Sequence, residues 1–123
     1  MITILERFPE SVIALAAHGR VTRKDYEEVV IPCVNAALSR QGKVRLYYEL
    51  GGDFSGLDAG AAWEDFKIGL EHLSRWERIA VITDVGWIRM AVGTFRFLMP
   101  GRIRIFDVDQ APAARSWITA AEQ

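Results

Sequence analysis

The stretch IAVITDVGWIRMAVGTFRFLMPGRIRIFDV, residues 79–108, predicts a strand, a helix and a second strand in succession. An apolar run at 79–83 is followed by a segment with helical periodicity, which Pro100 and Gly101 end. Residues 102–108 then alternate between polar and apolar side chains, as a half-buried strand does. Two strands joined by such a helix pair in parallel through a right-handed crossover. This stretch therefore predicts an α/β fold.

The helix predicted in this stretch is apolar over more of its surface than a core can cover. At the helical period its apolar side chains span roughly 220°, whereas packing against a core takes about 100°. The polar remainder is a narrow stripe that contains Arg89, Gly93 and Arg96. We expect the excess apolar surface to meet a ligand, a partner or a membrane. The helix thus predicts binding and carries no sign of a reaction.

Strand and helix patterns alternate in the same way through the rest of the chain. A capping box from Thr22 to Asp25 begins a first helix, in which Pro32 predicts a kink or a short break. The remaining elements are a hairpin from 2–8 and 11–18, a strand at 43–50, a Gly-rich loop at 51–56, a second helix at 59–73 and a last helix at 111–122. The order ββαβαβαβα predicts a five-stranded mixed sheet with four helices, in one domain over residues 1–123.

Length and composition fit one globular domain. The chain has 123 residues, of which 50% are hydrophobic and 25% are charged, enough for a single core. The net charge of −1 argues against a nucleic-acid partner, although residues 85–106 hold four arginines and no acidic residue. The one cysteine, Cys33, excludes an internal disulfide and fits helix packing. With no signal-peptide pattern, and with Arg89 and Arg96 interrupting the candidate membrane span, we expect a cytoplasmic protein.

We expect an apolar cavity between the second and third helices. Trp63 and Phe66 belong to the predicted core stripe of the second helix, and they could also form the floor of a pocket. The expected ligand is a small apolar or lipid-like molecule, with a homodimer through the third helix as a further expectation. The expected ligand-binding residues are Trp63, Phe66, Trp87, Met90, Phe95, Phe97, Leu98 and Met99.

Four arginines predict contact with an anionic surface. Arg89 and Arg96 lie in the polar stripe of the third helix, and Arg102 and Arg104 follow it. Beside aromatic side chains they favour peripheral binding to the inner face of a membrane. Alternatively, the arginines keep an apolar helix soluble and pair with Asp84, Asp107 or Glu77.

Enzymatic chemistry finds little support in the sequence. Ligands of open α/β sheets bind at the carboxyl ends of the strands, where we expect His18, Glu49, Asp53, Asp84 and Asp107. A histidine near carboxylates could act as a general base, but these residues are more simply interpreted as loop residues and helix caps. There is no metal-ligand spacing, nucleophile elbow or phosphate-binding loop, so we expect no metal and no cofactor.

The order of several short phrases resembles a known family across nearly the whole chain. The phrases are Asp25-Tyr26-Glu27 leading to Pro32, Trp63-Glu64-Asp65-Phe66-Lys67 with Gly69-Leu70, Arg78-Ile79-Ala80-Val81, Trp87-Ile88, Arg104-Ile105-Phe106-Asp107 and Trp117-Ile118. Together they look like the SpoIIAA-like proteins of the STAS/SEC14 group. The resemblance implies a SpoIIAA-like α/β fold without established enzymatic activity. It also implies two possible roles, since STAS domains switch protein partners and SEC14-type domains carry lipids or other apolar molecules.

Ser55 is the residue on which the STAS resemblance implies a switch. Anti-sigma-factor antagonists of that group carry a phosphorylated serine in an Asp-Ser-Ser-Gly-Leu loop, and this chain has Asp53-Phe54-Ser55-Gly56-Leu57. A phosphate there would meet free N–H groups if Ser55 began the second helix. However, Ser55 and Asp58 also form a plain capping box, which we expect to explain the serine without modification.

Overall fold

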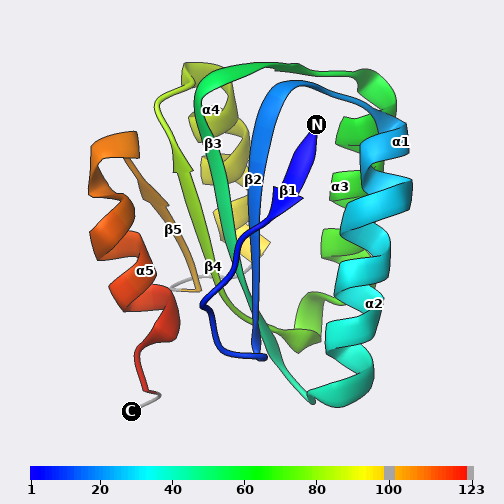
Figure 1. The fold of residues 1–123 in the computed structure, drawn as a ribbon, viewed down its shortest axis with the longest axis vertical. Coiled ribbons are helices and arrows are strands. Elements are labelled where there is room, and N and C mark those ends of the chain that lie inside the picture. Colours follow the sequence, from blue (N-terminus) through cyan, green and yellow to red (C-terminus); the bar gives the residue numbers. More distant parts are fainter. Residues whose placement is uncertain (99–101, 122–123) are drawn as a thin grey trace.

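The computed structural model of the chain describes residues 1–98 and 102–121 and consists of one mixed sheet with helices on both faces (Figure 1). The strands are β1 (Ile2–Ile4), β2 (Val12–Val21), β3 (Val44–Leu57), β4 (Trp76–Thr83) and β5 (Ile103–Phe106). The α-helices are α1 (Arg23–Asp25), α2 (Ile31–Arg40), α3 (Ala59–Glu71), α4 (Gly86–Phe95) and α5 (Ala111–Thr119). Short 3₁₀ turns lie at Leu73–Arg75, Arg96–Leu98 and Val108–Gln110.

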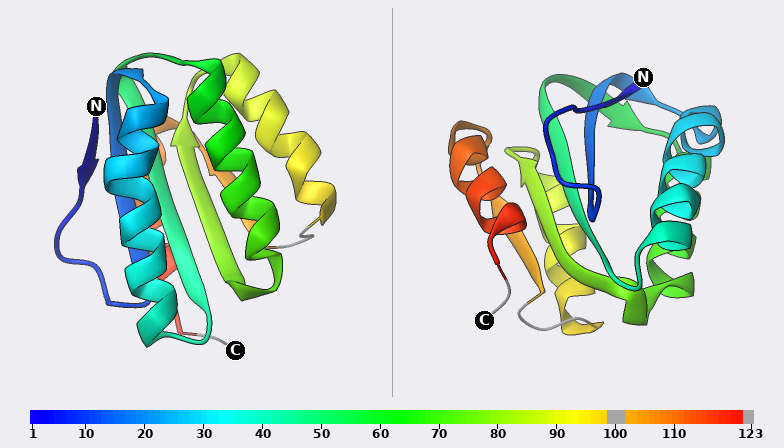
Figure 2. Two further views of the ribbon diagram at one scale, coloured as in Figure 1. Left: turned by 90° about the vertical axis from the view of Figure 1, so that its right-hand side faces the viewer. Right: turned by 60° about the horizontal axis from the view of Figure 1, so that its bottom comes forward.

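The strands lie in the order in which they occur in the sequence. β1 pairs antiparallel with β2, and β2, β3, β4 and β5 pair in parallel. Right-handed crossovers between successive neighbours place every connecting helix on the same face of the sheet. Figure 2 shows α2, α3 and α4 side by side on that face, while α5 covers the other. The predicted fold class is confirmed, although the first strand of the hairpin is shorter than expected, because β1 ends at Ile4.

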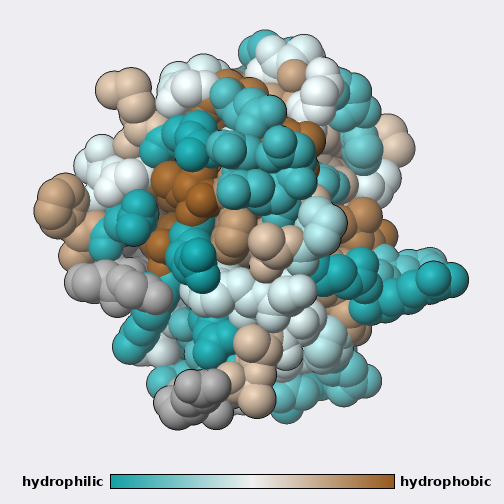
Figure 3. All heavy atoms as spheres, turned by 90° about the vertical axis from the view of Figure 1, so that its left-hand side faces the viewer, coloured by the Kyte–Doolittle hydropathy of each residue, from teal (hydrophilic) through white to brown (hydrophobic). Residues whose placement is uncertain are grey.

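The sheet separates two apolar clusters. Adjacent residues of a strand point to opposite faces, so Tyr48 packs in the larger cluster beneath α2, α3 and α4, whereas Tyr47 packs beneath α5. The smaller cluster also contains Ile118 and Phe106, and the ring centroid of Phe8 lies 5.0 Å from that of Tyr47. Figure 3 views the molecule from the α5 side and shows a surface that is mostly hydrophilic, with limited apolar areas. The smaller core is therefore well covered.

The first helical segment continues through Pro32 without a break. Residues Tyr26–Val30 form a π-helical turn, in which the N–H of Ile31 donates to the carbonyl of Tyr26, and Pro32 lies in the first turn of α2. Proline has no N–H to donate to the preceding turn. A π turn immediately before it absorbs that irregularity, as such turns do within helices. The predicted capping box of Thr22 and Asp25 is confirmed.

The predicted loop at 51–56 is wrong, because β3 runs on to Leu57. Beyond Leu50 the strand still pairs with β2, where Phe54 lies opposite Gly19 and Leu57 lies opposite Val21. The register shifts on both sides of Gly19, whose φ of 58° is a conformation that glycine adopts readily. The long β2 thus supplies backbone partners that keep the Gly-rich segment extended.

The start and the inward face of α3 also differ from the sequence-based expectation. Asp58 is the N-cap, and its side chain accepts a hydrogen bond from the N–H of Ala61 at 2.8 Å, so the predicted cap at Ser55 is wrong. Among the α3 side chains that the structure describes, Ala61, Glu64 and Ile68 are buried, whereas Trp63 is 55% exposed. The prediction that Trp63 belongs to a core stripe is therefore wrong.

The polar partners of Glu64 explain why α3 turns this face inward. Arg23 donates to the Glu64 carboxylate at 3.1 Å, and Lys67 lies 3.6 Å from it. A buried carboxylate is tolerated when it is paired in this way. The spacing of apolar residues along α3 predicted the wrong face, because it takes no account of Arg23, the partner of Glu64 that lies 41 residues away in the sequence.

Candidate functional site: an apolar cavity beneath α3 and α4

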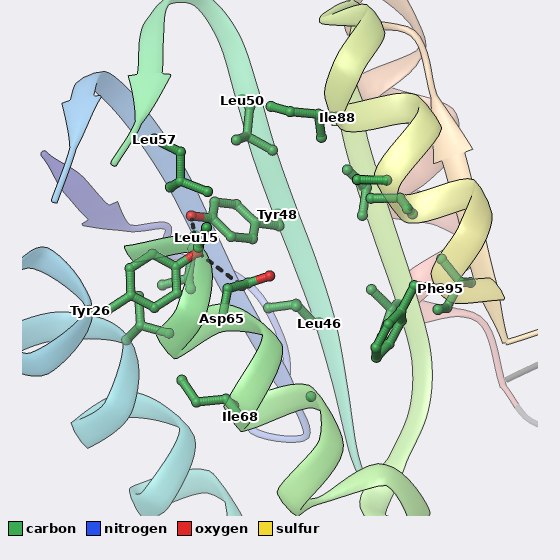
Figure 4. Close-up of a pocket in the computed structure, with 18 of the residues that line it drawn as sticks. Leu15, Tyr26, Leu46, Tyr48, Leu50, Leu57, Asp65, Ile68, Ile88 and Phe95 are labelled. Atoms are coloured by element: carbon green, nitrogen blue, oxygen red, sulfur yellow. Dashed lines mark hydrogen bonds between the residues drawn. The ribbon is translucent and has the colours of Figure 1, made fainter. Parts of the chain in front are cut away.

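A cavity of about 320 Å³ lies between the sheet and the helices that cover its larger face (Figure 4). The sheet contributes a floor of aliphatic side chains, and Tyr26, Val30 and Val34 close one side. From α3 come Ala62, Asp65, Ile68 and Gly69, and from α4 come Trp87, Ile88, Ala91, Val92 and Phe95. The volume falls at the lower end of the range of small-molecule sites.

The mouth of the cavity lies between α3 and α4. The exposed residues among those that line the cavity belong to these two helices, and they are Ala62, Asp65, Trp87 and Ala91. Farther along, Gly69 allows α3 to approach the Phe95 ring, since a Cβ at this position would lie 3.1 Å from Cζ of Phe95. The two helices are thus in contact at one end and leave the cavity accessible at the other.

Three polar side chains meet at one side of this apolar space. The Tyr26 hydroxyl donates to Oδ1 of Asp65 at 2.9 Å, and the hydroxyl oxygens of Tyr26 and Tyr48 lie 2.9 Å apart. Figure 4 shows the carboxyl group of Asp65 beside the two phenols, with its second oxygen directed into the cavity. Tyr26 comes from the π turn, Tyr48 from β3 and Asp65 from α3, so the fold assembles this group from three distant segments.

Burial sets the protonation behaviour of this group. It raises the pKa of the Asp65 carboxyl above its usual value, although the hydrogen bond from Tyr26 offsets part of the effect. Asp65 nevertheless keeps accessible surface, and its side chain lines the cavity. Burial, together with the nearby Asp65, also raises the pKa of both Tyr26 and Tyr48. The two phenols therefore stay protonated at neutral pH and act as hydrogen-bond donors.

Trp76 also lines the cavity and is only 2% exposed. Its indole Nε1 is buried and has no hydrogen-bond partner in the part of the chain that the structure describes. Such an orphan donor is rare in a native interior, where most buried polar groups are paired. Trp76 is thus a lining residue with a buried polar group that the described residues do not pair.

The residues expected to bind a ligand are only partly brought together. Trp87 and Phe95 line the cavity, whereas Met90 and Phe97 are 77% and 86% exposed and lie outside the lining, as does Trp63. Met99 and the side chains of Phe66 and Leu98 lie outside the described residues. The cavity is thus where we expected it, between the second and third helices, but many of its walls come from the sheet.

Sequence reasoning missed Tyr26, Tyr48, Asp65 and Trp76 as site residues. A signal for Asp65 was present, because it lies three residues before Ile68 and four before Gly69, and so on the same side of α3 as they do. An acidic residue between apolar positions of one helix face indicates either an error in the predicted face or a functional group. No comparable signal marked the tyrosines, since β3 is buried on both sides.

The four arginines expected to contact a membrane have different partners in the structure. Arg89 donates to the carbonyl of Thr83 at 2.9 Å and to Asp107 at 3.0 Å, as the alternative interpretation expected. Arg104 lies over the rings of Phe106 and Trp117, on the α5 side. Arg102 donates to the carbonyl of Trp76, and Arg96 is exposed. Within residues 1–98 and 102–121, no helix is long and apolar enough to span a bilayer.

The polar residues at the strand ends form two separate groups. Nδ1 of His18 lies 2.7 Å from Oδ2 of Asp53, and Nε2 lies 3.1 Å from the Thr3 hydroxyl. Asp84 accepts from the N–H of Val108, and Asp107 pairs with Arg89. None of these residues lines the cavity. The described residues include no cluster of His, Cys, Asp and Glu that could hold a metal ion.

Ser55 is exposed near the end of β3, three residues before the N-cap of α3. In an extended strand three residues span about 10 Å. A phosphate on Ser55 would therefore not begin the helix, and the backbone groups there are already capped by Asp58. Modification of Ser55 stays a prediction that rests on the short sequence resemblance alone.

The mixed sheet, its one-sided crossover helices and the cavity beneath them define a STAS-type α/β domain. The chain belongs to the SpoIIAA-like family, whose model matches residues 12–119. It is similar to the crystal structure of an uncharacterized DUF3478-family protein with a SpoIIAA-like fold from Shewanella loihica PV-4, with 28% sequence identity and a TM-score of 0.72. The similarity covers 95% of this chain and 93% of that one. No curated protein matched the chain.

Proposed function

We propose that this domain is a non-enzymatic binding module that holds a small apolar molecule in the cavity beneath α3 and α4. The observation that carries the proposal is the cavity itself, about 320 Å³ in volume, with almost entirely apolar walls. Largely preformed, mostly apolar sites with a few polar groups are typical of small-molecule binding. A SpoIIAA-like domain is typically non-catalytic, which agrees with a binding role.

Native mass spectrometry of the purified protein tests this proposal most directly. Gentle ionisation should show a fraction of the protein with an added small mass, and solvent extraction should release an apolar molecule of that mass. The same spectrum reports the number of chains in the assembly. Protein that is free of any adduct should then bind 1-octanol. An NMR titration that follows the backbone amides around the cavity measures this binding.

Filling the cavity should abolish this binding. Val92 is half-buried and lines the cavity, so Val92→Trp places a large ring in the space that the ligand would occupy. We expect the affinity for 1-octanol to fall at least about tenfold, which corresponds to about 1.4 kcal/mol. The matched control is Met90→Trp on the same helix, since Met90 is exposed and outside the lining. Equal binding by the wild type and a folded Val92→Trp variant would place the ligand elsewhere.

A second candidate function is association of two copies through α4. Trp87, Met90 and Phe97 leave large apolar side chains exposed at helical spacings of three and seven. Burying such side chains is the main favourable term in association. The family relationship is consistent with a protein-interaction module.

Phe97→Glu should convert a dimer of this kind to a monomer, because it would bury a charge in the apolar contact. Sedimentation velocity over a range of protein concentrations measures the change. Thr94 is also exposed, and Thr94→Glu is a second variant that should weaken the same contact. A wild-type protein that sediments as a monomer at high concentration would exclude this candidate and leave the cavity proposal unaffected.

A further inference from the structure

The charge of the cavity is unbalanced. Asp65 is the one residue with a charged side chain among the described residues that line it. The structure shows no lysine, arginine or histidine of the described segments within ion-pair distance of its carboxylate. In contrast, the neighbouring Glu64 is paired with both Arg23 and Lys67. A carboxylate surrounded by apolar walls is unfavourable without a compensating cation.

The hydrogen-bond directions at this end leave acceptors, not donors, facing the cavity. Tyr26 uses its hydrogen for Oδ1 of Asp65, so the hydrogen between the two phenols comes from Tyr48. Both hydroxyl hydrogens are then used within the protein. Oδ2 of Asp65 points into the open space, and it has no partner among the described residues (Figure 4). Tyr26 acts here as a positioning residue, because it fixes the rotation of the carboxyl group.

We propose that the cavity selects a compact apolar amine, whose ammonium group binds Oδ2 of Asp65 while its hydrocarbon part lies against the walls. This inference rests on the proposed binding function and adds the chemical class of the ligand. A primary ammonium supplies both the missing charge and hydrogen-bond donors, and charge-assisted hydrogen bonds are the stronger ones. Leu46, Leu50 and Ile88 line the cavity and provide apolar contacts for the hydrocarbon part.

The size of the cavity limits the ligand. At about 30 Å³ for each non-hydrogen atom, as in liquid water, a volume of about 320 Å³ holds roughly ten such atoms. An eight-carbon amine or an arylalkylamine is of this size, whereas a two-chain lipid is far larger. An eight-carbon carboxylate has the right length but the wrong charge, since it would place two negative groups together.

A series of three ligands with one chain length tests the inference. Octylamine, 1-octanol and octanoate are titrated at neutral pH into the wild-type protein, with backbone amide shifts around the cavity as the readout. We expect octylamine to bind about 10- to 100-fold more tightly than 1-octanol, as a charge-assisted hydrogen bond predicts. Octanoate should bind most weakly.

The variant Asp65→Asn should remove the preference for the amine and leave the affinity for 1-octanol within about twofold. Its amide oxygen can still accept from Tyr26, so the fold is expected to persist. The control Glu71→Gln removes an exposed carboxylate of the same helix and should keep the preference. Because the wild-type series needs no variant, the test stands even if Asp65→Asn fails to fold.

Each outcome separates this inference from the proposed function. If 1-octanol and octylamine bind equally, the cavity binds apolar molecules but does not select amines, and the inference is overturned. Tightest binding of octanoate would show that Asp65 is protonated and acts as a donor, which also overturns it. If none of the three shifts the cavity amides, the binding function itself fails.

Discussion

Replacing Trp76 with alanine should lower the free energy of unfolding by about 3–5 kcal/mol, the largest stability effect that we expect in this domain. Trp76 is among the largest fully buried side chains, and it begins β4 at the edge of the cavity. Its removal loses apolar burial and enlarges the cavity that it lines. Urea denaturation followed by far-ultraviolet circular dichroism measures the change.

Trp76→Phe is the informative companion to this variant. Phenylalanine keeps much of the buried area, and it lacks the indole N–H that has no partner among the described residues. Losing an unsatisfied buried donor removes its desolvation cost, which offsets part of the lost packing. We therefore expect a loss well below that of the alanine variant. Equal losses for the two variants would show that the indole N–H is hydrogen-bonded in solution.

The cavity and the stability of the domain are linked through residues such as Trp76 and Asp65. A core of this size could be closed by larger side chains, yet its lining includes Trp76, whose indole N–H has no partner among the described residues, and the acidic Asp65. Positions that break a local rule without an evident structural gain are expected at functional sites. Trp76 and Asp65 therefore add support to the binding role that we propose from the volume and the apolar walls of the cavity.

The order of elements could be predicted because each element carries its own periodicity. The strand at β4, the helix α4 and the strand β5 were all visible in residues 79–108, and a capping box marked the first helix. The excess apolar arc of the third helix also predicted that several large side chains would not reach the core. The exposure of Trp87, Met90 and Phe97 agrees with that expectation.

The errors lie where the structure depends on residues that are distant in sequence. The glycines after Leu50 are extended because β2 is long enough to pair with them. The orientation of α3 depends on Arg23, which pairs with Glu64, and on Tyr26, which donates to Asp65. The polar end of the cavity combines three segments, so no local pattern could show it. Propensity and periodicity describe segments, whereas tertiary contacts decide these details.

Arg45 connects the sheet to the end of α5, and its replacement with alanine should cost about 3 kcal/mol. Its buried guanidinium contacts the Glu77 carboxylate and donates to the carbonyl oxygens of Ile118, at 3.0 Å, and Ala120. Alanine would remove the charge partner and leave these carbonyls without this donor. Arg40→Ala is the control, because that exposed arginine on α2 should change stability by no more than about 0.5 kcal/mol.

The Arg45 variant also tests whether the two faces of the sheet act independently. Arg45 lies under α5, whereas the cavity lies on the opposite face, and the two apolar clusters share no residue. Below its unfolding transition, Arg45→Ala should therefore bind octylamine with wild-type affinity despite its lower stability. Residues far apart and without shared partners usually contribute additively. A large loss of affinity in the folded variant would instead show that the packing of α5 shapes the cavity through the sheet.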